Sequence, residues 1–134
     1  MLDPWIVAVA LGALLLNGLF DAVENHHIIV MLHSAERGLP LWAPETQVQM
    51  IVSNLKFHCN YFGVFLMAFG FWRLAGLGRA IATALWIYVP VGVLISVTPV
   101  ELARPLVLAR TAFFMAAFLM VAILFLKGAK ERIR

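Results

Sequence analysis

The side chains in this sequence that could do chemistry are concentrated in two short segments. Residues 21–27 read DAVENHH, and residues 53–60 read SNLKFHCN. Carboxylates and imidazoles exchange protons, amides donate and accept hydrogen bonds, and ammonium or guanidinium groups stabilise negative charge. The two segments therefore predict a polar site suited to proton transfer or to binding a polar head group.

Each residue of the predicted site has an expected role. If a reaction occurs, we expect Glu24 or His58 to act as the acid or base. Lys56 or Arg110 would then stabilise developing negative charge. Whether any reaction is catalysed stays open. The residues expected to bind the polar head of a ligand are Asp21, Asn25, His27, Lys56, Asn60 and Arg110.

The histidines leave two further interpretations open. Glu24 and His27 form one Glu-x-x-His unit, a spacing that places both side chains on one helix face and that occurs in di-iron sites of helical bundles. A di-iron site needs two such units, so we predict no metal, with Glu24, His27 and His58 as weak candidates for a single zinc or iron ion. His27 and His58 could alternatively clamp a haem. The sequence itself identifies no cofactor.

These polar segments interrupt long apolar stretches. The chain has 134 residues, of which 63% are hydrophobic and only 13% are charged, and its mean hydropathy is +0.95. A helix needs roughly 20 apolar residues to cross the hydrocarbon layer of a bilayer. Four stretches meet that requirement, at about residues 5–32, 45–73, 79–98 and 105–126. We therefore predict an all-α fold, a single transmembrane domain over residues 1–134 built as an integral membrane four-helix bundle.

Basic residues predict the orientation of these spans. Arg73 and Arg79 flank the second connection, and the C-terminal tail contains Lys127 and three further basic residues. Since cytoplasmic loops are enriched in Lys and Arg, both termini are expected on the cytoplasmic side, with the helices running up, down, up and down. The expected location is the cytoplasmic (inner) membrane of a bacterium.

Depth in the membrane connects charged residues of different spans. Asp21, Lys56 and Arg110 each lie 16 or 17 residues from the cytoplasmic end of their predicted span. At ~1.5 Å per residue, all three are roughly 25 Å above the inner face. Charges at such depth are costly unless they are paired. We therefore expect Asp21 and Glu24 to approach Lys56 and Arg110 in the outer third of the bundle.

Two hypotheses about function follow. In the first, the charged layer binds the head of an amphipathic ligand, namely a quinone, an isoprenoid or a lipid, with proton transfer as the chemistry if there is any. In the second, the chain is an accessory or assembly subunit of a larger membrane complex, and the charged layer is purely structural. Expected partners are membrane lipids, a hydrophobic small molecule or other membrane subunits. The net charge of +3 comes largely from basic residues beside the spans, so it does not imply binding to nucleic acid.

Overall fold

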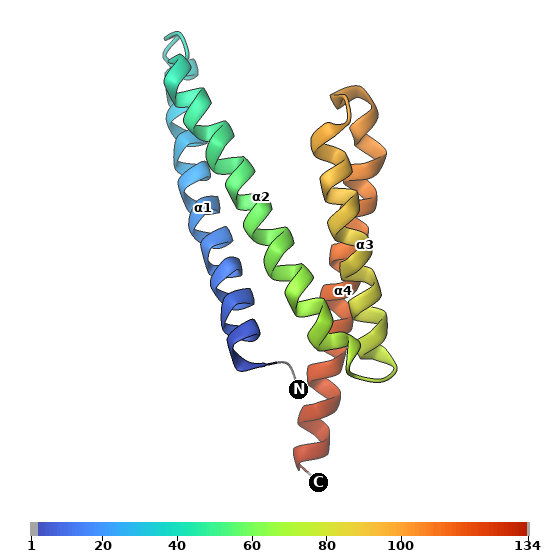
Figure 1. Cartoon of the computed structure of the whole chain (residues 1–134). Coiled ribbons are helices and arrows are strands. Elements are labelled where there is room, and N and C mark those ends of the chain that lie inside the picture. Colours follow the sequence, from blue (N-terminus) through green and yellow to red (C-terminus); the bar gives the residue numbers. More distant parts are fainter. Residues whose placement is uncertain (1–2, 134) are drawn as a thin grey trace. The chain divides into compact units, whose positions relative to one another are not determined.

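The chain is all-helical. The computed structural model describes residues 3–133, which form α1 (Pro4–Glu36), α2 (Ala43–Trp72), α3 (Leu77–Val97) and α4 (Val100–Ile133) (Figure 1). α1 begins at a proline, whose fixed φ angle and missing N–H suit the first turn of a helix. The predicted all-α fold with four helices is confirmed.

The first and last helices, α1 and α4, extend beyond the apolar stretches from which they were predicted. α1 ends at Glu36 rather than near residue 32, and α4 continues to Ile133 rather than ending near residue 126. The added residues read HSAE in α1 and KGAKERI in α4. Ala, Glu, Lys and Arg are favourable helix residues, so the helical backbone continues where the sequence becomes polar. Hydropathy therefore locates the helices but not their ends.

Three of the four helices are long and apolar enough to cross a membrane. Among the described residues these are α1, α3 and the part of α4 from Glu101 to Gly128. α2 has 30 residues, but its first half is polar, and its wholly apolar segment, residues 62–72, spans only about 16 Å. The three apolar helices indicate an integral membrane protein, whereas a crossing by α2 stays a prediction.

The described residues group into two compact units. One is the segment Ala8–Gly63, and the other consists of residues 3–7 and 64–133. In the first unit, α1 and the first part of α2 run antiparallel and are joined by residues 37–42 (Figure 1). We call this arrangement the hairpin.

The hairpin turns at a glycine in the left-handed conformation. Gly38 has a φ of 66° and donates its N–H to the carbonyl of Ala35 at 3.0 Å. The N–H of Leu39 donates to the carbonyl of Ser34 at 2.9 Å. These two bonds form a Schellman motif, which satisfies the last carbonyls of α1 and ends the helix.

Small residues bring α1 and α2 close together in the hairpin. Ala10 and Ala13 are buried. A Cβ atom added at Gly63 would lie 2.8 Å from Cγ of Leu14 and 3.0 Å from the carbonyl oxygen of Ala10. Both distances are shorter than an optimal van der Waals contact, so glycine is the residue that fits here. Small residues at the contact are typical of helices that pack within membranes.

In the second unit, α3 packs against α4. Ile81 and Ala82 of α3 are fully buried, and the ring of Tyr88 lies 5.5 Å from the ring of Phe114 on α4, measured between centroids. Pro90 lies inside α3 without ending it. The buried residues of α3 recur at helical spacing: Gly78, Ile81, Ala82, Ala84, Leu85, Tyr88 and Gly92.

Candidate functional site

Three charged side chains meet between α1 and α2 in the hairpin. Nζ of Lys56 donates to Oδ1 of Asp21 at 3.0 Å and also to Oε2 of Glu24. Asp21 and Glu24 are three residues apart and share one face of α1, so a single lysine reaches both. We call Asp21, Glu24 and Lys56 the charged triad. The predicted approach of both acids to Lys56 is confirmed, whereas a role of these residues in binding stays a prediction.

Glu24 is the most deeply buried member of the charged triad. Its side chain is 9% exposed, compared with 17% for Lys56 and 53% for Asp21. Its second carboxylate oxygen, Oε1, accepts a hydrogen bond from Nε2 of Gln49 at 3.2 Å. Gln49 and Lys56 lie seven residues apart, which is two turns of α2 on one face. Both oxygens of Glu24 therefore have donors, as the burial of a carboxylate requires.

Asp21 is the exposed member of the charged triad. Besides its bond with Lys56, it accepts a hydrogen bond at 3.4 Å from Nδ2 of Asn25, one turn further along α1. When ionised, two carboxylates and one ammonium group give the charged triad one negative charge in excess. Asp21 is therefore the member through which the charged triad can meet another molecule.

Two further residues that the sequence predicts to bind a ligand are Asn60 and Arg110. Asn60 lies four residues after Lys56 on α2 and is half-buried. Arg110 lies in α4 and belongs to the other unit. Its approach to Asp21 and Glu24 stays a prediction, because an equal depth in the membrane does not by itself assign a partner.

His27 contacts a partner that the sequence analysis did not name. Its Nδ1 lies 2.5 Å from Oε1 of Glu45, near the start of α2, and the two side chains are 18% and 19% exposed. In an antiparallel hairpin, a residue further along the first helix faces a residue nearer the start of the second helix. Since Glu24 faces Gln49, His27 must face a residue near position 45. The pairing of His27 with Glu45 could therefore have been predicted from the sequence only if the exact position of the turn were known.

Replacing His27 with Leu is expected to lower the free energy of unfolding by about 1–2 kcal/mol, because the largely buried Glu45 loses a hydrogen-bond partner. His33→Leu is the matched control. His33 contacts Glu36 at 3.3 Å, but these side chains are 64% and 75% exposed, so its loss is expected to change stability by less than about 0.5 kcal/mol. Unfolding of the purified protein in denaturing detergent, followed by circular dichroism, measures both variants. Equal losses would contradict a specific role for the His27–Glu45 contact.

His58 lies on a different face of α2 from the charged triad. At about 100° per residue, His58 is turned about 160° away from Lys56. Its Nδ1 donates to the carbonyl oxygen of Asn54 at 2.7 Å. Glu24 and His58, both expected as acid or base, therefore have separate surroundings. His58 instead borders an open apolar groove of about 470 Å³ within the hairpin, lined by Val9, Gly12, Ala13, Leu16, His58, Cys59 and Phe62.

The weak metal candidates are not brought together. Within the described part of the chain, no three His, Cys, Asp or Glu side chains are grouped closely enough to hold an ion. Glu24 is engaged by Lys56 and Gln49, and His27 is engaged by Glu45. The interpretation of Glu24, His27 and His58 as a metal site therefore has no geometric support.

Helical folds host many unrelated functions, so a function has to be argued from particular residues. The charged triad is the most unusual feature of the hairpin because it brings three ionisable groups together on two helices, one of which is apolar enough to cross a membrane. Neither a protein-family model, nor a curated protein, nor a solved structure matches this chain.

Proposed function

We propose that the charged triad binds the polar head of an amphipathic ligand, whose apolar part lies against the hairpin within the membrane. The observation that supports the proposal is the half-exposed carboxylate of Asp21 beside Lys56, in a helix apolar enough to cross a membrane. Ionisable groups at such depth are costly, and they mark functional sites by default.

The charge of the triad discriminates among ligands. One negative charge is in excess, so a head that donates hydrogen bonds or carries positive charge is favoured. Of the expected ligands, a quinol and a lipid with an amine head fit this requirement. The phosphate head of an isoprenoid phosphate would need an additional cation.

Proton transfer, if it is part of the function, fits Asp21 better than the residues that the sequence nominates. Both oxygens of Glu24 already accept hydrogen bonds, and His58 lies on another face of α2. A general acid or base must be within reach of the group with which it exchanges a proton. Asp21 is half exposed and therefore accessible to a bound head group.

The proposal includes a membrane topology. α1 has the length and composition of a membrane-spanning helix, and α2 runs back along it with Lys56 turned toward α1. Pairing this charge inside the hairpin lowers the cost of inserting α2 into lipid. We therefore propose a four-helix bundle with four crossings, running up, down, up and down. The basic residues near Arg73 and in the tail favour cytoplasmic termini, in a bacterial inner membrane.

The proposal predicts that Asp21→Asn weakens ligand binding. The full chain, reconstituted in lipid nanodiscs, is titrated separately with a short-chain ubiquinol analogue and with phosphatidylethanolamine, and native mass spectrometry measures the bound fraction. The wild type is expected to bind one of these probes at one molecule per chain. Asp21→Asn is expected to bind it at least about tenfold more weakly, because a neutral amide is a poorer acceptor than a carboxylate.

Glu36→Gln is the matched control for this experiment. Glu36 is an exposed carboxylate at the end of the same helix, outside the charged triad. Its replacement is expected to leave the affinity for the probe unchanged. Absence of binding by the wild type, or equal binding by wild type and Asp21→Asn, would contradict the proposal.

A second candidate function is favoured by the contacts within the charged triad. Lys56 contacts both acids, and the two oxygens of Glu24 accept hydrogen bonds from Gln49 and Lys56. Such a network can serve to fix the register of α1 against α2 in an accessory or assembly subunit of a larger membrane complex. This alternative predicts that neither probe binds and that the gently extracted chain copurifies with a stoichiometric membrane partner.

A further inference from the structure

The connection between α1 and α2 is both apolar and exposed. Residues 38–44 read GLPLWAP and contain no charged side chain. Leu39, Leu41 and Trp42 are each more than half exposed. We call residues 39–42 the apolar turn. Connecting segments normally run over the surface in contact with water and are polar, so a turn of this composition is suited to contact with an apolar partner.

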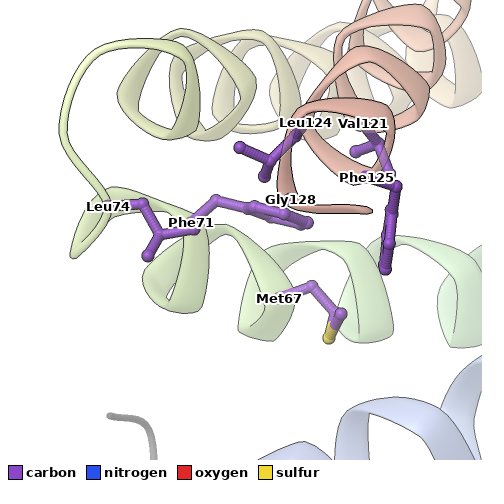
Figure 2. Close-up of a pocket in the computed structure, with 7 residues that line it drawn as sticks. All are labelled: Met67, Phe71, Leu74, Val121, Leu124, Phe125 and Gly128. Carbon is purple, nitrogen blue, oxygen red and sulfur yellow. The ribbon is translucent and has the colours of Figure 1, made fainter. Parts of the chain in front are cut away.

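Exposed apolar residues on the helices differ from those of the apolar turn. Figure 2 shows an example in the second unit, where Met67 and Phe71 of α2 face residues of α4 across an apolar groove of about 870 Å³. The part of α4 from Glu101 to Gly128 is apolar enough to cross a membrane. Lipid tails are as apolar as such side chains, so apolar residues on a membrane helix need no specific partner. The apolar turn lies outside the helices and needs a separate explanation.

The length of α1 indicates where the apolar turn lies. Its 33 residues rise about 50 Å, compared with ~40–45 Å for a bilayer that includes both head-group regions. Trp5, which is exposed, lies at the start of α1, and Trp42 follows soon after its end. Tryptophan is enriched at both membrane interfaces because its ring is apolar and its N–H donates hydrogen bonds. The two tryptophans therefore flank α1 at a separation that matches the two interfaces.

We propose that the apolar turn inserts into the head-group region of the membrane and anchors the hairpin there. Ile29 and Leu32, in the last third of α1, are also more than half exposed, so the apolar surface of α1 continues to the turn. This continuity favours a lipid surface as the partner, because lipid already surrounds a helix that crosses the membrane. Glu36 and Arg37, which precede the turn, are exposed and remain in contact with water and lipid head groups.

The anchor also fixes the height of the charged triad. Lys56 follows Trp42 by 14 residues, which corresponds to about 21 Å along α2. The head-group region on each side of a bilayer is only roughly 5–8 Å thick. A turn anchored in that region therefore places Lys56 and its two partners inside the hydrocarbon layer. The anchoring itself does not depend on whether the charged triad binds a ligand.

The depth of Trp42 is measured by fluorescence quenching. The full chain carrying Trp5→Phe/Trp72→Phe/Trp86→Phe retains Trp42 as its only tryptophan. It is reconstituted in phosphatidylcholine vesicles that carry a nitroxide either on the head group or near the end of an acyl chain. We expect the head-group nitroxide to quench Trp42 at least about twofold more strongly than the deep nitroxide, because the indole lies in the head-group region.

Trp86 is the matched control for depth. It lies near the middle of α3, a helix apolar enough to cross a membrane. The variant Trp5→Phe/Trp42→Phe/Trp72→Phe retains only Trp86, and the deep nitroxide is expected to quench it more strongly than the head-group nitroxide.

The contribution of the apolar side chains is tested in the variant that retains Trp42. Adding Leu39→Asp/Leu41→Asp is expected to lower quenching by the head-group nitroxide at least about twofold and to raise quenching by aqueous iodide, because charged side chains draw the turn into water. Arg37→Glu changes the charge beside the turn without removing an apolar side chain. It is expected to leave both kinds of quenching unchanged.

A second measurement keeps all four tryptophans, in case their replacement disturbs folding. Cys59 is the only cysteine of the chain, so Cys59→Ala/Leu41→Cys carries a single spin label at position 41. We expect oxygen, which dissolves in lipid, to reach this label more readily than a water-soluble nickel chelate does. The opposite ranking would overturn the proposal.

The quenching experiment can also overturn the proposal. Stronger quenching of Trp42 by the deep nitroxide, or no quenching by either nitroxide, would show that the apolar turn does not lie in the head-group region. In the second case, quenching by aqueous iodide would place the turn in water. Protection from iodide as well would show that a protein surface covers it.

Discussion

Replacing Lys56 with Met is expected to lower the free energy of unfolding by about 3–5 kcal/mol, because loss of one partner leaves a buried charge uncompensated. Glu24, whose side chain is 9% exposed, would keep its hydrogen bond from Gln49 but lose its cation. Met retains much of the apolar stem of Lys, so the loss reports the charge rather than the packing. Unfolding of the ligand-free protein in denaturing detergent, followed by circular dichroism, measures the change.

A second substitution tests whether the charge of Glu24 causes this loss. Adding Glu24→Gln to Lys56→Met leaves a neutral amide where a charge was buried, and we expect it to recover most of the stability. Arg104→Met removes an exposed cation and is expected to change stability by less than about 0.5 kcal/mol. If the double variant is no more stable than Lys56→Met alone, the pairing of Lys56 with Glu24 is not the source of the effect.

Depth in the membrane predicted the contact between Asp21 and Lys56, and the reason is that α1 and α2 follow each other in the chain. Consecutive antiparallel helices are neighbours, so two charges at the same height on them have only the choice of facing each other or turning away. The cost of leaving charges unpaired in an apolar setting decides in favour of contact. For Arg110, on α4, the sequence predicts the same height, but the partner of Arg110 depends on packing between helices that are not consecutive.

Other features of the hairpin depend on details that hydropathy does not encode. The contact of His27 with Glu45 follows from the position of the turn at Gly38, and a change of one residue in that position would place a different residue opposite His27. The close approach at Gly63 depends on which residues of α1 it meets, namely Ala10 and Leu14. The sequence contains no Gly-x-x-x-Gly motif that would have indicated this contact.

The prediction of membrane-spanning segments from hydropathy is also limited by contacts between helices. Three helices carry a continuous apolar composition and are identified by it, whereas α2 mixes an apolar end with a polar beginning. The polar residues Gln49 and Lys56 of α2 form hydrogen bonds with α1. The composition of α2 by itself does not reveal these contacts. Composition therefore identifies a membrane-spanning helix when its whole sequence is apolar. It is less informative about a helix whose polar side chains are paired with those of a neighbouring helix.

Replacing Gly78 with Ala is expected to lower the free energy of unfolding by about 3 kcal/mol, near the upper end of the usual cost of overpacking. Gly78 is buried at the start of α3. A Cβ atom there would lie 2.3 Å from Cβ of Leu74 and 2.8 Å from the carbonyl oxygen of Phe71. The connection between α2 and α3 must therefore move to accept a single methyl group. Detergent unfolding followed by circular dichroism measures the loss.

Gly128→Ala separates the effect of the new methyl group from that of replacing a helical glycine. A Cβ atom at Gly128 meets no atom within 4 Å, so this change is expected to be neutral or to stabilise by up to about 1 kcal/mol.

Variants at Leu74 identify which atoms clash with the new methyl group at position 78. Leu74→Ala keeps the Cβ atom and is not expected to rescue Gly78→Ala, whereas Leu74→Gly removes that atom and leaves only the contact with the Phe71 carbonyl. If Leu74→Gly restores part of the stability lost in Gly78→Ala and Leu74→Ala restores none, the clash involves the Cβ atom of Leu74 and the backbone of the turn. Full rescue by Leu74→Ala would contradict this, because the clash would then come from the outer atoms of the Leu74 side chain.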